Sequence, residues 1–238
     1  MKRLKNLVNA ILNLFGYKIQ KEIPDFLKQV VNVCDLTDCP LLVDVGANTG
    51  QYGRMILKSG FKGKLVSFEP QAAAHAKLLL SSKNWLNWEV ASPCVLGEKD
   101  VKEVDLFLSD NSVSSSLLKK SNENSDLFNQ VGIERVRMLR FENFYKEHFS
   151  SEKFFLKIDT QGYELGVLKG CESILDNCIG IQLEVSIFET YIGSPGYFEI
   201  LSWLQDRGFA IYDCLPESRN RHGRLLEMDL LMINKDYV

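Results

Sequence analysis

Short apolar runs alternate with helical patterns along most of the chain. The run at residues 41–45 is followed at once by Gly46, which is typical of a buried strand ending in a tight turn. Similar runs predict strands at residues 64–68, 88–91, 104–108, 154–158, 179–185, 209–212 and 228–233. Apolar positions at helical spacing predict helices at residues 51–59 and 71–82, around 165–174 and around 198–204.

This order of elements predicts an α/β fold. Strands that alternate with helices form a mostly parallel sheet with helices on both faces. The last two predicted strands have no helix between them, so we expect them to pair antiparallel at one edge of the sheet. Residues 109–126 contain seven serines, and this composition predicts a loop or lid.

The first 21 residues have a character of their own. They carry five basic and no acidic side chains, and their apolar residues recur at helical spacing. Asn9 and Asn13 interrupt the apolar stretch that a signal peptide would need. We therefore divide the chain into a basic amphipathic helical extension, residues 1–35, and a main domain, residues 36–238. Two interpretations of the N-terminal helix stay open: it packs on the domain or on a second subunit as a homo-oligomer contact, or it lies on an anionic membrane surface.

Composition narrows the class of protein. The 28 Lys and Arg residues against 31 Asp and Glu give a net charge of −3, which argues against non-specific binding to nucleic acid. No apolar run approaches the roughly 18–20 residues that span a bilayer. The six cysteines have no Cys-x-x-Cys spacing and predict reduced thiols. A cytoplasmic protein is expected, membrane-peripheral if the N-terminal helix binds lipid.

The first candidate site is the turn after the first predicted strand. Gly46 and Gly50 allow a ligand to approach the backbone closely at the carboxyl edge of a parallel sheet. The turn lacks the G-x-G-x-x-G spacing that cradles a pyrophosphate. Asn48 occupies the place of the middle glycine and tolerates left-handed backbone angles. A plain tight turn is the alternative.

Two acids point to the ligand of this turn. Glu69 ends the second predicted strand, where doubly wound folds place a carboxylate that accepts hydrogen bonds from a ribose diol. Asp44 precedes the turn, and its charge would repel a pyrophosphate but attract a cation. S-adenosylmethionine has a ribose, a sulfonium and an ammonium group, so it fits both acids.

Several motifs in order resemble one known family. VDVGANTG at 43–50, SFEP at 67–70, LKIDTQGYE at 156–164, QLEV at 182–185 and MDLL at 228–231 look like the signature blocks of FkbM-type methyltransferases. The resemblance covers roughly residues 41–234. It implies a Rossmann-like class I methyltransferase fold, with a mostly parallel seven-stranded sheet and an antiparallel edge hairpin. It also implies S-adenosyl-L-methionine as cofactor. Many relatives carry Glu where this chain has Gln161, so we infer no metal ligand there.

The family resemblance implies methylation of a hydroxyl on a sugar, a polysaccharide precursor or a secondary metabolite. An alcohol is a poor nucleophile until a base accepts its proton. Asp159 and Glu184 follow apolar strands and are the first candidates for this base; a helix cap and a salt bridge are their respective alternatives. His222 is a third candidate, in an Arg-rich segment at residues 219–224 that would form a basic lip for an acidic or phosphorylated acceptor. A solvated loop is the alternative there.

Other side chains have weaker signals. Ser115 lies in the serine-rich segment, which resembles a family feature near the cofactor, so its hydroxyl is a candidate cofactor ligand. Tyr52, with Trp85 and Trp88, either stacks on adenine or packs in the core. His75 and His148 are expected at the surface.

Two classes of function remain. The first is an S-adenosylmethionine-dependent O-methyltransferase with a small-molecule or carbohydrate acceptor. The second is a nucleotide-binding module that has lost catalysis and serves as a partner or scaffold protein. The cofactor residues Asp44, Gly46, Gly50 and Glu69 are all present, which favours the first.

Overall fold

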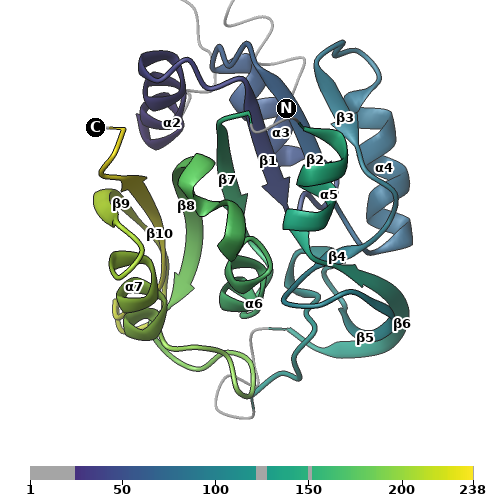
Figure 1. The fold of residues 1–238 in the computed structure, drawn as a ribbon. Coiled ribbons are helices and arrows are strands. Elements are labelled where there is room, and N and C mark those ends of the chain that lie inside the picture. Colours follow the sequence, from purple (N-terminus) through teal and green to yellow (C-terminus); the bar gives the residue numbers. More distant parts are fainter. Residues whose placement is uncertain (1–24, 122–127, 150–151, 238) are drawn as a thin grey trace, which may run out of the picture.

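The computed structural model describes residues 25–121, 128–149 and 152–237. Seven strands form one sheet in the order β3-β2-β1-β7-β8-β10-β9 (Figure 1). Strands β1, β2, β3, β7 and β8 pair in parallel, whereas β10 is antiparallel to both β8 and β9. The predicted parallel sheet with an antiparallel edge hairpin is therefore confirmed.

The predicted strands of the large sheet are all present, but β9 and β10 are longer than predicted, and the helix α5 was not predicted. The strands of the large sheet are β1 (Leu41–Val45), β2 (Lys64–Phe68), β3 (Trp88–Val90), β7 (Phe154–Ile158), β8 (Cys178–Ser186), β9 (Phe209–Arg219) and β10 (Leu225–Asn234). The α-helices are α2 (Asp25–Leu36), α3 (Gln51–Lys58), α4 (Ala72–Ser82), α5 (Phe141–His148), α6 (Glu164–Lys169) and α7 (Tyr197–Gln205). A 3-10 helix, η3 (Glu172–Asn177), continues the apolar pattern after α6.

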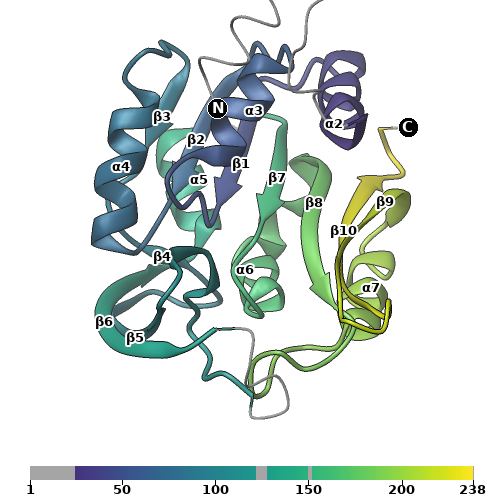
Figure 2. The same cartoon turned by 180° about the vertical axis from the view of Figure 1, so that it is seen from behind.

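The helices cover both faces of the sheet. Leu41, Val43 and Val45 of β1 pack in a cluster with residues of α5, α6 and α7, while Leu42 packs in a second cluster with α2, α3 and α4. Figures 1 and 2 show these two helical layers from opposite sides. Side chains of a strand alternate between faces, so burial on both sides explains why β1 is a continuous apolar run apart from Asp44.

The helix α2 packs on the sheet. Its buried side chains include Phe26, Val30 and Cys34, which share a cluster with Leu42 and Phe155 of the central strands. The basic helix expected at residues 1–21 lies outside the described residues, so the domain boundary at residue 35 stays a prediction. None of the helices within the described ranges is long and apolar enough to cross a membrane.

A second, three-stranded sheet was not predicted from the sequence. It has the order β4-β6-β5 and consists of β4 (Val95–Leu96), β5 (Val101–Ser109) and β6 (Gln130–Leu139). It lies below β2 and β3 in Figure 1, at the end of the large sheet to which the parallel strands point. The serine-rich segment leaves β5 through a 3-10 helix, η1 (Ser112–Ser114). This sheet therefore places residues 112–117 of the segment beside the carboxyl edge of the large sheet.

The two histidines that were expected at the surface differ in their burial. His75 was expected at the surface, and this is wrong: it is buried in α4, with its Nε2 atom 2.8 Å from the carbonyl oxygen of Ala91. His148 is exposed, as expected. All six cysteines are free thiols, and every one except Cys214 is buried.

The backbone at Gly46 approaches β7 so closely that no side chain fits. Gly46 has φ +76°, and a Cβ atom there would lie 1.8 Å from the carbonyl oxygen of Asp159. Gly193 has nearly the same φ, +77°, but open space around it. Alanine at either position has the cost of a left-handed backbone, but only at Gly46 does its Cβ atom also clash with a neighbour. Gly46→Ala should therefore lower the free energy of unfolding by about 1–3 kcal/mol more than Gly193→Ala does. Urea unfolding of the two variants measures the difference, and equal losses would contradict this contact.

Candidate active site

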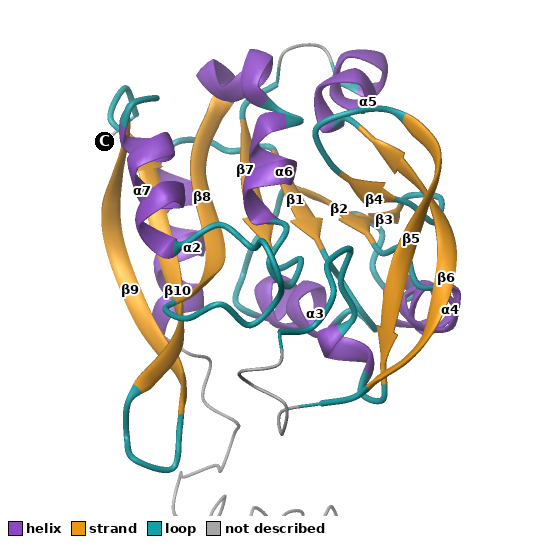
Figure 3. Cartoon of the chain, turned by 90° about the horizontal axis from the view of Figure 1, so that it is seen from below, coloured by secondary structure: helices purple, strands orange, loops and turns teal. Residues whose placement is uncertain are grey.

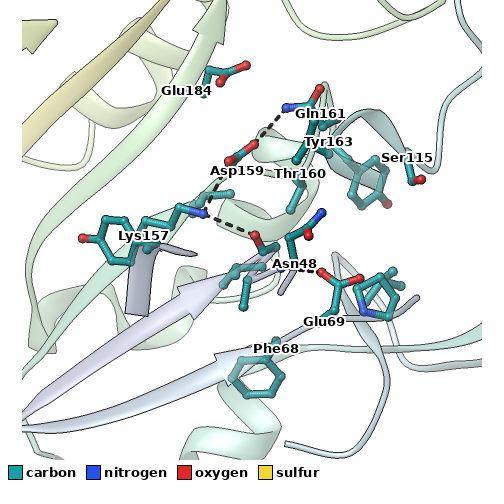
Figure 4. A pocket seen from close by; sticks show the side chains of 18 of the residues that line it. Asn48, Phe68, Glu69, Ser115, Lys157, Asp159, Thr160, Gln161, Tyr163 and Glu184 are labelled. Atoms are coloured by element: carbon teal, nitrogen blue, oxygen red, sulfur yellow. Dashed lines mark hydrogen bonds and ion pairs between the residues drawn. The ribbon is translucent and has the colours of Figure 1, made fainter. Parts of the chain in front are cut away.

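The ends of the central parallel strands surround a cavity of about 290 Å³. Its walls include the turn after β1, the end of β2, the segment after β7 and the serine-rich segment (Figure 4). Figure 3 looks onto this end of the sheet, with α3 and the β5–β6 sheet beside it. Open α/β sheets bind ligands in this position because the loops after adjacent strands diverge there. Seven of the predicted site residues line the cavity: Gly46, Asn48, Tyr52, Glu69, Ser115, Asp159 and Glu184.

The turn after β1 holds the Glu69 carboxylate in place. Asn48 has φ +47°, as expected from its position in the turn. Its backbone N–H donates to Glu69 Oε2 at 2.8 Å, and the N–H of Gln71 donates to Glu69 Oε1 at 2.8 Å. Burial nevertheless raises the pKa of Glu69 to about 7. The carboxylate is therefore fixed in orientation, and its protonation changes near neutral pH.

Two predicted cofactor residues lie behind the cavity wall rather than in it. Asp44 is fully buried, accepts a hydrogen bond from Ser67 at 3.1 Å and has the Lys157 ammonium 3.3 Å from its Oδ1 atom. Gly50 faces α4, since a Cβ atom there would lie within 3.1 Å of Trp88, Leu78 and Ser81. Asp44 thus contacts the cavity residue Lys157, and Gly50 allows α3 to pack closely on its neighbours.

Lys157 is the residue that the sequence analysis missed. Its Nζ atom lies 3.3 Å from Asp44 Oδ1, 3.5 Å from Asp159 Oδ2 and 3.3 Å from the carbonyl oxygen of Gly46. Burial alone would lower its pKa, but the carboxylates of Asp159 and Asp44 outweigh burial and hold the pKa above its usual value. A lysine inside an otherwise apolar buried strand was the available signal. It is the one cation among the described residues that line this cavity.

Asp159 is presented to the cavity by a rigid turn. Gln161 has φ +58°, and its Nε2 atom donates to Asp159 Oδ1 at 2.9 Å, while Lys157 is paired with the other oxygen (Figure 4). Glu164 is buried and accepts hydrogen bonds from the backbone N–H groups of Thr160 and Gly162 at 3.1 and 3.0 Å. The Asp159 side chain remains 38% exposed. It is therefore oriented yet accessible to a ligand.

A chain of polar side chains forms the wall towards β8 and β10. The Tyr52 hydroxyl donates to Gln182 Oε1 at 2.9 Å, and Gln182 Nε2 donates to Asp229 Oδ2 at 3.0 Å. Glu184 lies apart from Asp159 in Figure 4. Burial, with the carboxylates of Asp159 and Glu227, raises the pKa of Glu184 to about 9. In the free protein Glu184 is therefore protonated at neutral pH, whereas Tyr52 is tied into the wall.

The serine-rich segment closes one side of the cavity. Asn48 Nδ2 donates to the carbonyl oxygen of Ser112 at 2.8 Å, so the segment is joined to the turn after β1. Ser115 lines the cavity, and its Oγ atom accepts a hydrogen bond from Ser109 N at 3.2 Å.

Trp88 packs in the core and donates from Nε1 to Ser67 Oγ at 3.0 Å. The core alternative therefore holds for Trp88.

His222 is placed outside the cavity. It is exposed in the loop between β9 and β10, where its Nε2 atom accepts a hydrogen bond from Arg221 Nε at 3.1 Å. It is not one of the described residues that line the cavity. The structure therefore does not bring His222 to Asp159 and Glu184, because the loop extends beyond the end of β8.

The cavity fits a ligand that combines a ribose with positive charge. Glu69 at the end of β2 can accept hydrogen bonds from a diol. The acidic residues Asp159, Glu217 and Asp229 line the cavity together with a single lysine and the protonated Glu184, which favours a cation over a phosphate. Val95, Leu96 and Leu106 form an apolar wall suited to a heteroaromatic ring.

Comparisons with known proteins concern the family and the fold of the chain. The chain matches the methyltransferase FkbM domain over residues 44–211. Sp1610 of Streptococcus pneumoniae, a candidate tRNA (m1A22) methyltransferase solved with S-adenosyl-L-methionine, is 12% identical, with a TM-score of 0.50 over 90% of this chain and 73% of Sp1610. Precorrin-6y C5,15-methyltransferase of Geobacter metallireducens is 9% identical, with a TM-score of 0.47 over 91% and 93% of the two chains. A search of curated protein sequences found no match.

The fold and the cavity define a Rossmann-like class I methyltransferase domain that uses S-adenosylmethionine. Since the matched domain spans more than half of the sequence, the chain belongs to the FkbM methyltransferase family. The family resemblance seen in the sequence is thereby confirmed.

Cofactor binding should depend on pH through Glu69. A carboxyl with a pKa of about 7 is mostly protonated at pH 6, so the protein must lose a proton before the carboxylate can bind the cofactor. Between pH 8 and pH 6 the affinity for S-adenosylmethionine should fall about tenfold from this group alone. Titration calorimetry on the wild type and on Glu69→Gln measures it. Ionisation of the ligand itself affects both proteins equally, so the difference between their pH profiles comes from Glu69. An equal pH dependence in both proteins would contradict the role of Glu69.

Proposed function

We propose that this protein is an O-methyltransferase that methylates a hydroxyl on a sugar, a polysaccharide precursor or a secondary metabolite. The observation that carries the proposal is the Asp159 carboxylate, oriented by Lys157 and Gln161 and still accessible in the cavity wall. A positioned base accelerates transfer to an alcohol by typically about 10²–10⁴-fold.

The cofactor supplies the methyl group from its sulfonium. After transfer the sulfur is a neutral thioether, and S-adenosylhomocysteine is the leaving group. Glu69 would hold its ribose, and the carboxylates around Asp159 would balance its positive charge. The serine-rich segment, joined to Asn48, would limit the access of water to the cavity. These residues would align the acceptor oxygen, and alignment alone accounts for a large part of such a reaction's acceleration.

Asp159 is the base that the charges favour. Glu184 carries a proton in the free protein at neutral pH, because burial and neighbouring carboxylates raise its pKa to about 9. Asp159 has the Lys157 ammonium group 3.5 Å from one carboxylate oxygen, and its side chain is exposed to the cavity. In the reaction Asp159 would accept the proton of the acceptor hydroxyl while the oxygen forms the new bond to carbon.

The test is transfer from methyl-labelled S-adenosylmethionine to a panel of mono- and oligosaccharides and hydroxylated metabolites. We expect a labelled O-methyl ether, identified by NMR, with one equivalent of S-adenosylhomocysteine formed. Labelled N-methyl or C-methyl products would overturn the proposed specificity. Cofactor binding without transfer to any hydroxyl would favour the non-catalytic module.

A further inference from the structure

A second cavity of about 350 Å³ adjoins the first. Four residues line both cavities: Val113, Asp159, Gln161 and Glu184. The second cavity is completed by residues from the serine-rich segment, the segment just before β6, the segment after β8, and the β9–β10 hairpin: Ser114, Phe128, Phe188, Thr190, Ser218, Arg219, Leu226 and Glu227. The candidate base therefore lies where the two cavities meet.

The walls of this second cavity are built by specific contacts. The Tyr191 hydroxyl donates to Gln161 Oε1 at 2.9 Å and lies 3.1 Å from the carbonyl oxygen of Ser114, so one side chain joins the turn after β7 to the serine-rich segment. Phe128 is buried and packs on Tyr191, with ring centroids 5.6 Å apart. Phe188 has the Arg224 guanidinium 3.7 Å from its ring centroid. The cavity thus has apolar surfaces next to polar groups, as expected for binding a small polar molecule.

The charges around this cavity are mostly negative. Asp159 and Glu227 contribute carboxylates, and Ser218 Oγ donates to Glu227 Oε2 at 2.7 Å, while Glu184 contributes a third carboxyl group that is protonated in the free protein. Arg219 contributes a guanidinium, but this residue is exposed and donates to the carbonyl oxygen of Gly223 at 2.9 Å. An anionic acceptor would have to approach the carboxylates of Asp159 and Glu227, which costs Coulomb energy in a partly buried site.

We propose that the second cavity binds the acceptor, and that this acceptor carries a protonated amine beside the hydroxyl that is methylated. The inference rests on the proposed O-methyltransferase function and adds the charge of the substrate. The carboxylates of Glu184 and Glu227 bind the ammonium group, Phe128 and Phe188 contact the apolar face of the molecule, and the acceptor hydroxyl reaches Asp159.

The electrostatics of Glu184 support this assignment. Burial and the neighbouring carboxylates hold its pKa at about 9 in the free protein. A cation bound beside it would favour the ionised carboxylate. The proposed charge of the acceptor is opposite to that expected from the basic lip. Among the described residues of the Arg-rich segment only Arg219 lines the second cavity, where it lies with three acidic residues, Asp159, Glu184 and Glu227.

Binding of three sugars with the same hexose ring tests the proposal: D-glucosamine, N-acetyl-D-glucosamine and D-glucose 6-phosphate. The full chain is saturated with S-adenosylhomocysteine, and dissociation constants are measured at pH 7 by NMR titration. We expect glucosamine to bind at least about tenfold more tightly than the acetylated sugar, the equivalent of 1.4 kcal/mol, and the phosphate to bind most weakly. Glu227→Gln should reduce this preference at least threefold. Glu199→Gln, an exposed residue on α7, should leave it unchanged.

The outcomes separate this inference from the proposed function. Equal binding of glucosamine and the acetylated sugar, including no detectable binding of either, overturns the inference, as does tighter binding of the phosphate. A selective glucosamine complex whose nitrogen becomes methylated supports the cavity but overturns O-methylation. O-methyl products from neutral acceptors without any preference for the amine support O-methylation and overturn the inference alone.

Discussion

Replacing Glu69 with alanine should weaken the binding of S-adenosylmethionine at least tenfold. The backbone N–H groups of Asn48 and Gln71 fix both carboxylate oxygens, so the side chain meets the cofactor without reorganisation. A hydrogen bond to a charged group contributes about 1.5–3 kcal/mol, and 1.4 kcal/mol corresponds to a factor of ten in the dissociation constant. Titration calorimetry with S-adenosylmethionine and S-adenosylhomocysteine measures the loss.

The control is Glu89→Ala. Glu89 lies on the neighbouring strand β3, is exposed and pairs with Lys64 at 2.7 Å. Its removal should leave cofactor affinity unchanged. Because alanine at position 69 leaves the N–H groups of Asn48 and Gln71 without their acceptor, Glu69→Gln serves as a milder second variant. Wild-type affinity in a folded Glu69→Ala protein would exclude Glu69 as a cofactor ligand.

Replacing Asp159 with asparagine should lower kcat by about 10²–10⁴-fold and change the affinity for S-adenosylmethionine by no more than a few-fold. Asparagine keeps the shape of the side chain but cannot accept the proton of the acceptor hydroxyl at neutral pH. Single-turnover methyl transfer measures the chemical step, and calorimetry measures cofactor binding on the same protein.

The matched control is Asp105→Asn, in which an exposed aspartate of β5 loses its charge near Arg135. It should leave both quantities unchanged. If turnover of Asp159→Asn equals that of the wild type, Asp159 is not the base. If cofactor affinity falls in parallel with turnover, the role of Asp159 lies in binding the cofactor instead.

Local patterns were sufficient for the large sheet. The strands at residues 41–45, 64–68 and 154–158 have the bounds that their apolar runs predicted, since strands buried on both faces need such runs. The positive φ of Asn48 also followed from residue type and position. By contrast, β6 was missed because half of its residues are exposed and charged residues stand between its apolar ones. Its partner β5 lies across the serine-rich segment, so no short-range signal marks the pairing.

The family, the cofactor and the strands of the large sheet were determined by the sequence, because motifs and hydrophobic periodicity are properties of short segments. The tertiary structure decided which of the acidic residues are buried and which line the cavities. The order β1-β7-β8-β10 places Lys157 between Asp44 and Asp159 and aligns Asp229 with Glu184. Asp44 is consequently a buried partner of Lys157, while Asp159 and Glu184 lie between two cavities. Contacts between residues so far apart along the chain arise from strand pairing and helix packing, and these cannot be read from local sequence.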